Sequence, residues 1–396
     1  MFRLFYKIAS VVMVMLAVSA CGKLEDKRKL LAEIQNIKSE YAPDKRTALF
    51  DLTVVDGSDA YILAGETNLP EAVAALKTKL EADNIAFEDA IKVLPSEDLN
   101  GKTRALINIS VANLRSAPKH SAELATQATL GTPVKVLKKE DDWYYIQSPD
   151  NYLSWVDAGG ITLMDNQIMK NWLSTDKLMY TKTYGHAYTG PDKLQPVSDL
   201  VAGNILEIIK YVDEFYIVSY PDGRQAYVSK EESEPYDTWL ENLKPNADSL
   251  IATSKTMMGV PYLWGGTSTK GMDCSGFTKT VYFLNGMVIP RDASQQVHTG
   301  KAIDSVANFE NLEKGDLLFF GRKATDTLPE KVVHVGIWIG NNEFIHASEM
   351  IRISSMDENA KNYDAFNRNR YLRTKRIMKE KDEGLMSLLD SPLFKN

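Results

Sequence analysis

An internal repeat near the middle of the chain constrains the fold more than any other feature of the sequence. At a shift of 72 positions, residues 136–156 align onto residues 208–228 without a gap. The shift places Trp143 on Phe215 and Pro149-Asp150 on Pro221-Asp222. Each copy has the pattern of a strand, a Pro-Asp turn and a further strand. The repeat therefore predicts two small all-β barrels, which we assign to residues 104–165 and 174–236.

The first copy opens with Val111-Ala112-Asn113-Leu114-Arg115-Ser116-Ala117-Pro118, followed by a Val-Leu strand and Asp-Trp-Tyr. This run resembles bacterial SH3-like domains of cell-wall proteins. The second copy keeps the strands but lacks the Asn-Leu-Arg opening, so we interpret it as a diverged barrel.

The start of the chain has the pattern of an exported lipoprotein. Two basic residues precede an apolar run, and Val18-Ser19-Ala20-Cys21 is a small-residue cleavage pattern. The apolar segment, residues 8–20, is shorter than the roughly 20 residues that a membrane-spanning helix needs. We therefore expect a signal peptide at 1–20, a lipid on Cys21 that holds the protein to a membrane, and a cell-envelope location facing the periplasm or the cell surface.

Residues 21–103 are expected to hold the lipid anchor, a tether and a small α+β unit of unassigned function. The charged segment from Leu24 to Glu40 predicts a surface helix or a tether. A helix starting at Pro70, with Asn68 as its cap, follows two strand-like runs, and a short strand comes after it.

Residues 246–378 change to a mixed pattern in which helices come first and strands follow, which predicts an α+β domain. Residues 379–396 are interpreted as a C-terminal tail. The whole chain is thus expected to be multidomain α+β: a small α+β unit, two SH3-like barrels and a C-terminal α+β domain. Its net charge is −7 and it has no long basic block, so a nucleic acid is not an expected partner.

Cys274 is the candidate nucleophile. The chain has two cysteines, and a lipid on Cys21 would leave Cys274 without a disulfide partner in an oxidising compartment. Asp273 is a good N-cap residue, so Cys274 would begin a helix, where unpaired N–H groups and the helix dipole favour a thiolate. The alternative is that Cys274 is a small core residue.

A thiol nucleophile needs a base and a group that orients the base, and His334 and His346 lie on consecutive predicted strands. A two-residue turn would put them on opposite faces of the sheet. A three-residue loop, Gly340 to Asn342, would set His346 opposite Gly336 and His334 on its diagonal, roughly 7 to 8 Å away. We expect the latter, with Gly336 leaving room for both rings; the alternative is that each His is simply a hydrogen-bonding partner. One Cys and two His lack the spacing of a zinc site, so no metal or cofactor is expected.

Six motifs in the C-terminal domain occur in the order typical of the NlpC family of papain-like cell-wall cysteine peptidases, which residues 246–378 resemble. They are Tyr262-Leu263-Trp264-Gly265-Gly266, Asp273-Cys274-Ser275-Gly276-Phe277, Pro290-Arg291-Asp292-Ala293-Ser294-Gln295-Gln296, Lys314-Gly315-Asp316-Leu317, His334-Val335-Gly336-Ile337 and His346-Ala347. The resemblance implies that Cys274 is the nucleophile, His334 the base and His346 the residue that orients it. It also implies cleavage of peptidoglycan stem peptides, most often between γ-D-glutamate and diaminopimelate or lysine.

Two barrels before such a domain resemble the branch of γ-D-glutamyl-L-diamino acid endopeptidases that act on stem peptides with a free N-terminal L-alanine. In that branch the first barrel closes the substrate groove with an acid and a tyrosine, and Glu123 and Tyr152 match those segments. The carboxylates of Glu123 and Asp292 would offset the desolvation of the substrate ammonium.

The remaining candidates for substrate binding are more open. Ser275 and Arg291 could donate to the α-carboxylate of γ-D-glutamate. Asp273 could be a helix cap alone or also contact substrate, and Tyr262 and Trp264 could be core aromatics or walls of the groove. Tyr262 could also join the Cys274 backbone N–H in binding the oxyanion. Two other functions stay open: another murein amidase or acyltransferase, and a non-catalytic wall-binding lipoprotein.

Overall fold

The computed structural model describes residues 25–58, 60–391 and 393–395, and the chain divides into two compact units, 1–98 and 99–396. The signal peptide and Cys21, the expected lipid site, lie outside the described residues. Within the described part of the chain, no helix is long and apolar enough to cross a membrane.

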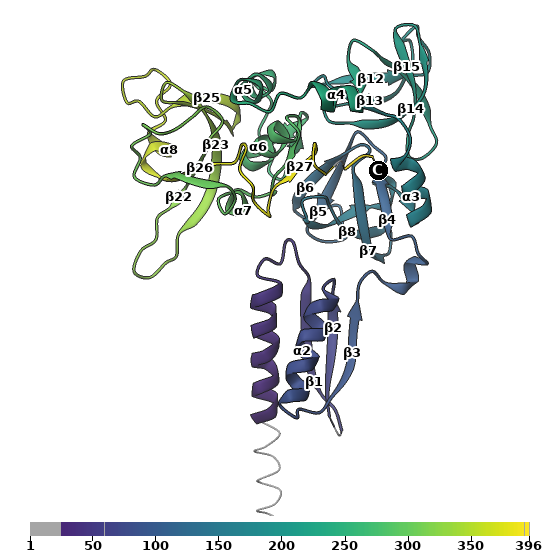
Figure 1. The fold of residues 1–396 in the computed structure, drawn as a ribbon, viewed down its shortest axis with the longest axis vertical. Helices are drawn as coiled ribbons and strands as arrows, with labels where there is room; N and C mark the ends of the chain where they lie inside the picture. Colours follow the sequence, from purple (N-terminus) through teal and green to yellow (C-terminus); the bar gives the residue numbers. More distant parts are fainter. Residues whose placement is uncertain (1–24, 59, 392, 396) are drawn as a thin grey trace, which may run out of the picture. The chain divides into compact units, whose positions relative to one another are not determined.

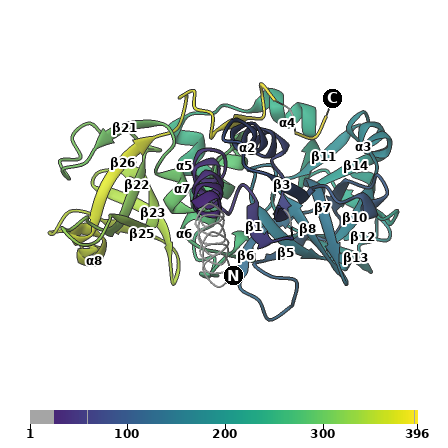
Figure 2. The same ribbon diagram turned by 90° about the horizontal axis from the view of Figure 1, so that it is seen from below.

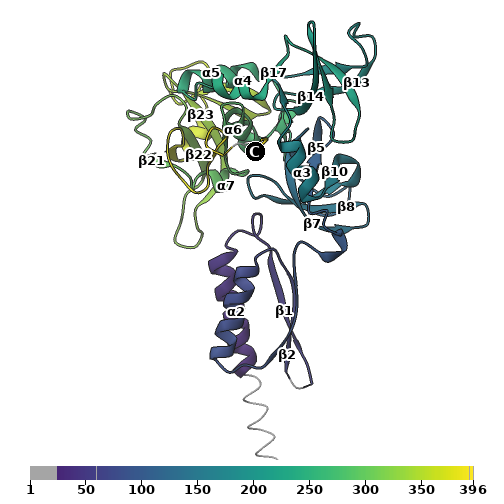
Figure 3. The ribbon, with the colours of Figure 1, turned by 45° about the vertical axis from the view of Figure 1, so that its right-hand side comes forward.

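The N-terminal unit packs two helices on one face of a small sheet (Figure 3). Strand β1 (Phe50–Asp56) pairs antiparallel with β2 (Tyr61–Thr67), which pairs parallel with β3 (Phe87–Val93) across helix α2 (Pro70–Ala82). The small α+β unit is thus present.

Two local expectations for this unit were wrong. The helix expected near the start is present over residues 25–41, but it is packed rather than solvated, because Leu30, Ile34 and Ile37 are buried in the core that α2 shares. Asn68 does not cap α2; Leu69 holds the N-cap position, and the Asn68 side chain instead accepts a hydrogen bond from the Leu49 N–H.

The first barrel is a seven-stranded sheet in the order β10-β4-β7-β8-β9-β5-β6. Its strands are β4 (Arg104–Ile107), β5 (Val111–Arg115), β6 (Leu124–Thr129), β7 (Pro133–Glu140), β8 (Trp143–Gln147), β9 (Leu153–Asp157) and β10 (Ile161–Met164). The 3₁₀ turn η1 (Glu97–Leu99) precedes the barrel, and η2 (Ala158–Gly160) joins β9 to β10. Helix α3 (Asn166–Leu173) leads to the second barrel.

The second barrel repeats the first, with strands β14, β15 and β16 beginning and ending 72 positions after β7, β8 and β9. Even the bulge recurs, between Val136 and Lys138 in one copy and between Ile208 and Lys210 in the other. Its strands are β11 (Lys177–Tyr180), β12 (Gly185–Tyr188), β13 (Pro196–Leu200), β14 (Ile205–Val212), β15 (Phe215–Ser219), β16 (Gln225–Ser229) and β17 (Ser233–Pro235). Helix α4 (Tyr236–Asn242) follows.

The C-terminal domain has a six-stranded sheet in the order β21-β26-β22-β23-β24-β25, and its helices, except the one at residues 365–369, lie on the side that faces the barrels (Figures 1 and 2). The strands are β21 (Lys301–Asp304), β22 (Leu317–Arg322), β23 (Lys331–Gly340), β24 (Glu343–Ser348), β25 (Met350–Ser355) and β26 (Tyr371–Arg376). The helices are α5 (Ala247–Thr256), α6 (Cys274–Phe283), α7 (Ala293–Gln296) and α8 (Ala365–Asn369). The short strands β18 (Thr267–Ser268) and β19 (Gly271–Met272) form a separate pair.

The C-terminal segment is more than a tail. Strand β27 (Met386–Ser387) pairs antiparallel with β20 (Met287–Val288), and Leu388 and Phe394 are buried. Phe394 packs edge to face on Tyr236, just beyond the second barrel, and on Phe283 of helix α6. The segment therefore connects the catalytic domain with the region after the barrels.

Strand β6 of the first barrel docks directly on the catalytic domain. The Gln127 side chain accepts hydrogen bonds from the Thr267 N–H and the Ser268 hydroxyl. Gly265 has φ +79°, and a Cβ there would lie 2.1 Å from the Leu124 carbonyl oxygen. The close approach of the barrel thus depends on a missing side chain.

Gly265→Ala should weaken this docking more than a positive φ alone explains. Gly259→Ala is the matched control, because Gly259 has φ +81° and nothing within 4 Å of its missing Cβ. The control should cost about 1 kcal/mol of unfolding free energy, and Gly265→Ala should cost roughly 2 to 4 kcal/mol. Thermal unfolding of both variants checks this, and equal shifts would contradict the packing argument.

Candidate active site

Cys274 is the first residue of helix α6, as expected, and Asp273 is its N-cap. The Asp273 carboxylate accepts a hydrogen bond from the Gly276 N–H at 2.7 Å and from the Gly265 N–H at 2.9 Å. Cys274 is 7% exposed and packs at the edge of the domain core. Its sulfur interacts with the backbone N–H of Val335, the residue after His334, so the helix start abuts strand β23.

The two histidines meet in the register that was expected, but a different device produces it. The turn has two residues, Asn341 and Asn342, both with positive φ, and a bulge between Trp338 and Gly340 supplies the extra shift. The expected three-residue loop was wrong, because an extra residue in a strand changes the register as a longer loop does. His334 Nε2 lies 2.8 Å from His346 Nδ1. A Cβ at Gly336 would lie 3.1 Å from the His346 Cβ, so the glycine does make room.

The His346 ring is held by partners that the sequence did not indicate. Its Nε2 lies 3.0 Å from the Ser354 hydroxyl and 3.8 Å from the Asp364 carboxylate. Ser354 is on strand β25, and Asp364 caps helix α8. Strand β25 and helix α8 were not predicted, and neither residue belongs to a motif, so sequence reasoning missed both.

Burial keeps the thiol and both imidazoles neutral near pH 7. It raises the pKa of Cys274 to about 12. The neighbouring Asp273 charge also raises this pKa, whereas the backbone N–H groups of Val335 and Ser275 and the Arg291 charge lower it. Burial also lowers the pKa of His334 well below 6.5 and that of His346 to about 4. The expected thiolate is therefore not the resting form, because desolvation outweighs the helix N-terminus.

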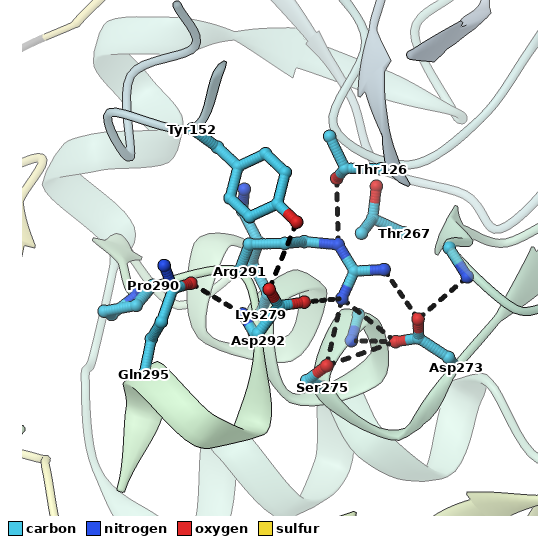
Figure 4. A network of polar contacts seen from close by, with 12 residues as sticks. Thr126, Tyr152, Thr267, Asp273, Ser275, Lys279, Pro290, Arg291, Asp292 and Gln295 are labelled. Atoms are coloured by element: carbon cyan, nitrogen blue, oxygen red, sulfur yellow. Dashed lines mark hydrogen bonds and ion pairs between the residues drawn. The ribbon is translucent and has the colours of Figure 1, made fainter. Parts of the chain in front are cut away.

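Asp273 and Arg291 form a buried ion pair beside the nucleophile (Figure 4). The Arg291 guanidinium donates to both Asp273 oxygens, to the Ser275 hydroxyl and to Thr126 of the first barrel, at 2.6 to 3.1 Å. Arg291 is 1% exposed. Asp273 is thus more than a cap, since it also neutralises a buried cation.

The first barrel brings its two expected residues to this interface. The Trp264 indole N–H donates to Glu123 Oε1 at 2.7 Å. The Tyr152 hydroxyl donates to Asp292 Oδ2 at 3.1 Å (Figure 4). Trp264 is 63% exposed, so it is not a core aromatic. Tyr262 is half-buried against the core. Burial raises the pKa of the Tyr262 hydroxyl, and a negative charge on the nearby Cys274 would raise it further.

The assembled residues can perform nucleophilic acyl transfer. Because His334 Nε2 is engaged by His346, Nδ1 is the nitrogen left for the thiol proton. Among the described residues, no group of three or more His, Cys, Asp or Glu side chains could hold a metal ion.

Such a site, on an α+β domain preceded by two barrels, defines a papain-like cysteine peptidase. The chain belongs to the NlpC/P60 family, which matches residues 259–370, while the bacterial SH3 domain matches residues 110–162. The motif-based resemblance is thereby confirmed, as are the fold class and the enzyme class.

Several known proteins are similar to this chain. The gamma-D-glutamyl-L-lysine dipeptidyl-peptidase of Bacillus cereus is 33% identical over 233 residues, which cover 57% of this chain and 67% of that protein. Dipeptidyl-peptidase 6 of Lysinibacillus sphaericus is 27% identical over 268 residues, covering 64% of this chain and 92% of that protein. The crystal structure of an NlpC/P60 family protein from Bacillus cereus superposes with a TM-score of 0.59 at 28% identity, covering 69% of this chain and 99% of that one.

His346 should make stability depend on pH. Its pKa is about 4 in the folded protein and 6.5 as the ordinary value, so the unfolded chain binds the proton more readily between these pH values. The stability that the neutral imidazole contributes is complete above pH 6.5 and is lost as the pH falls. The loss reaches about 3 kcal/mol near pH 4. Urea unfolding of wild type and His346→Asn at several pH values should give a shallower pH slope for the variant; identical slopes would contradict the assignment.

The Cys274 thiol should react slowly at neutral pH in the free protein. With a pKa of about 12, its thiolate fraction rises about tenfold for each pH unit from 7 to 9. The rate of alkylation by iodoacetamide, followed by mass spectrometry of the Cys274 peptide, should rise in the same way. Free cysteine is the control, since its rate levels off near pH 9. A rate for Cys274 that does not change with pH would indicate a preformed thiolate.

Proposed function

We propose that this chain hydrolyses the bond between γ-D-glutamate and lysine or diaminopimelate in peptidoglycan stem peptides with a free N-terminal L-alanine, releasing L-Ala-γ-D-Glu. The observation that carries the proposal is the contribution of the first barrel to the interface beside Cys274, through Glu123 and Tyr152. Two relatives that are named gamma-D-glutamyl-L-lysine dipeptidyl-peptidase support the proposal.

The amine is the part of the substrate that these residues suit. A buried α-ammonium needs carboxylate partners and hydrogen-bond acceptors, which Glu123, Asp292 and the Tyr152 hydroxyl provide. Ser275 and the Arg291 guanidinium, which lie between Asp292 and Asp273, suit the α-carboxylate of γ-D-glutamate. Trp264 and Tyr262 would flank the peptide.

Cys274 attacks the γ-carbonyl carbon while its proton passes to Nδ1 of His334. This requires that His334 carry its resting proton on Nε2, donated to His346 Nδ1, and that His346 donate from Nε2 to Ser354. The oxyanion is met by the backbone N–H of Cys274 and the hydroxyl of Tyr262. The C–N bond then breaks as His334 protonates the leaving amine, and water, activated by the same imidazole, hydrolyses the thioester.

The export and anchoring of the enzyme belong to the same proposal. The pattern around Cys21 supports removal of residues 1–20 and attachment of a lipid to Cys21. The enzyme would then act in the cell envelope, on peptides released from the wall. Mass determination of the protein extracted from membranes, with and without Cys21→Ala, tests this.

The activity is tested with L-Ala-γ-D-Glu-L-Lys, its diaminopimelate counterpart and the N-acetylated form of each. The free-amine peptides should release L-Ala-γ-D-Glu, and acetylation should slow release at least 100-fold, because it removes the charge and adds bulk in the amine pocket. Chromatography with mass detection follows the product.

Cys274→Ala is the control and should release none. Equal cleavage of free and acetylated peptides would reject the amine pocket and favour another murein amidase. Wall binding without any cleavage would leave the non-catalytic alternative.

A further inference from the structure

The Pro-Asp turn, which the repeat places in both barrels, is used differently in the two copies. In the second barrel Asp222 stays local: its carboxylate accepts from the Arg224 backbone N–H and from Arg224 Nε, at 3.2 and 2.8 Å. Arg224 lies 72 positions after Tyr152, so the first barrel has a tyrosine where the second has this arginine. Asp150 therefore has no arginine in its own turn. Asp150 instead pairs with Lys279 on helix α6, the helix that begins with Cys274.

The Asp150–Lys279 pair is buried at the interface between barrel and catalytic domain. The side chains of Asp150 and Lys279 are 2% and 17% exposed, and both line a small cavity with Phe283 and Val288. The Ser148 hydroxyl donates to the other Asp150 oxygen at 2.6 Å. Burial alone would raise the Asp150 pKa, but the Lys279 charge and these hydrogen bonds hold it below its ordinary 3.8.

The pair fixes the backbone from which Tyr152 projects. The Ser148 N–H donates to the Tyr152 carbonyl, and the Asn151 N–H donates to the Ser148 carbonyl, so the turn moves as one piece. Lys279 and Ser275 lie one helical turn apart on the same face of α6. The Ser275 hydroxyl accepts a hydrogen bond from the Arg291 guanidinium. The ion pair therefore ties the Tyr152 turn to the part of α6 that carries the nucleophile.

We propose that Asp150 and Lys279 are positioning residues for substrate specificity: their ion pair sets the Tyr152 hydroxyl against Asp292 and so determines how strongly the enzyme selects a free N-terminal amine. Neither side chain needs to touch the substrate. The inference rests on the proposed function, because it concerns the amine pocket. It differs from that proposal in assigning selectivity to a contact between the barrel and α6, outside the pocket.

The test measures binding in a Cys274→Ala background, where no peptide is cleaved. The two probes are L-Ala-γ-D-Glu-L-Lys and propionyl-γ-D-Glu-L-Lys, which differ only by the amine. Asp150→Asn and Lys279→Met should each raise the Kd of the alanyl peptide about 10- to 100-fold, the range of one charge-assisted hydrogen bond. The Kd of the propionyl peptide should change less than about threefold.

Two further variants keep the result specific. Asp222→Asn removes the equivalent acid from the second barrel and should leave both affinities unchanged. The double variant Asp150→Asn/Lys279→Met should match the single variants, because the second change removes nothing further. It also leaves no unpaired buried charge, so it carries the test if a single variant unfolds.

The outcomes separate the inference from the function on which it rests. If the Cys274→Ala protein binds both peptides equally, the amine pocket itself is wrong. If it prefers the alanyl peptide and the Asp150 and Lys279 variants keep that preference, or lose affinity for both peptides alike, the ion pair is only structural and the inference is overturned.

Discussion

The carboxylate of Asp273 is the interaction on which the active-site region depends. It caps the helix that presents Cys274, accepts the Gly265 N–H and neutralises the buried Arg291 guanidinium. Arg291 in turn reaches Thr126 in the first barrel. A charge buried this deeply is stable only with complete compensation, so each member fixes the geometry of the others. The nucleophile, the loop before it and the barrel are therefore held by one group.

The same carboxylate has a cost for reactivity. Its negative charge adds to burial in raising the pKa of the Cys274 thiol, and the helix N-terminus does not compensate. A neutral thiol beside a neutral imidazole is less open to oxidation, because thiolates are the forms that oxidants attack. In the proposed mechanism, the proton moves to His334 when a substrate carbonyl is in place to accept the sulfur.

Much of this architecture follows from the sequence, for identifiable reasons. Because the repeat has no gaps, the strands of one barrel predict where the corresponding strands of the other begin and end. The bulge after Val136 also recurs after Ile208. The helix start at Cys274 follows from the capping chemistry of Asp273, which is local. The pairing of His334 with His346 depends on the register between β23 and β24. The expected register is present, but it results from a bulge between Trp338 and Gly340 that the sequence pattern did not predict. Ser354 and Asp364, the partners of His346, lie on a strand and at a helix start that the sequence pattern does not predict. Thr126, a partner of Arg291, is 165 residues away in sequence, so only the fold reveals these contacts.

The duplicated barrel explains how a wall-associated fold could become part of an active site. Both copies keep the strands and the Pro-Asp turn, since these specify the barrel itself. They differ at position 152 and its counterpart 224, where one has a tyrosine and the other an arginine that satisfies its own turn. The first copy lacks that arginine, and its acid, Asp150, pairs with Lys279 on α6 instead. A tyrosine at this position, where the second barrel has an arginine, thus supplies a phenol to the interface and leaves Asp150 to pair with Lys279.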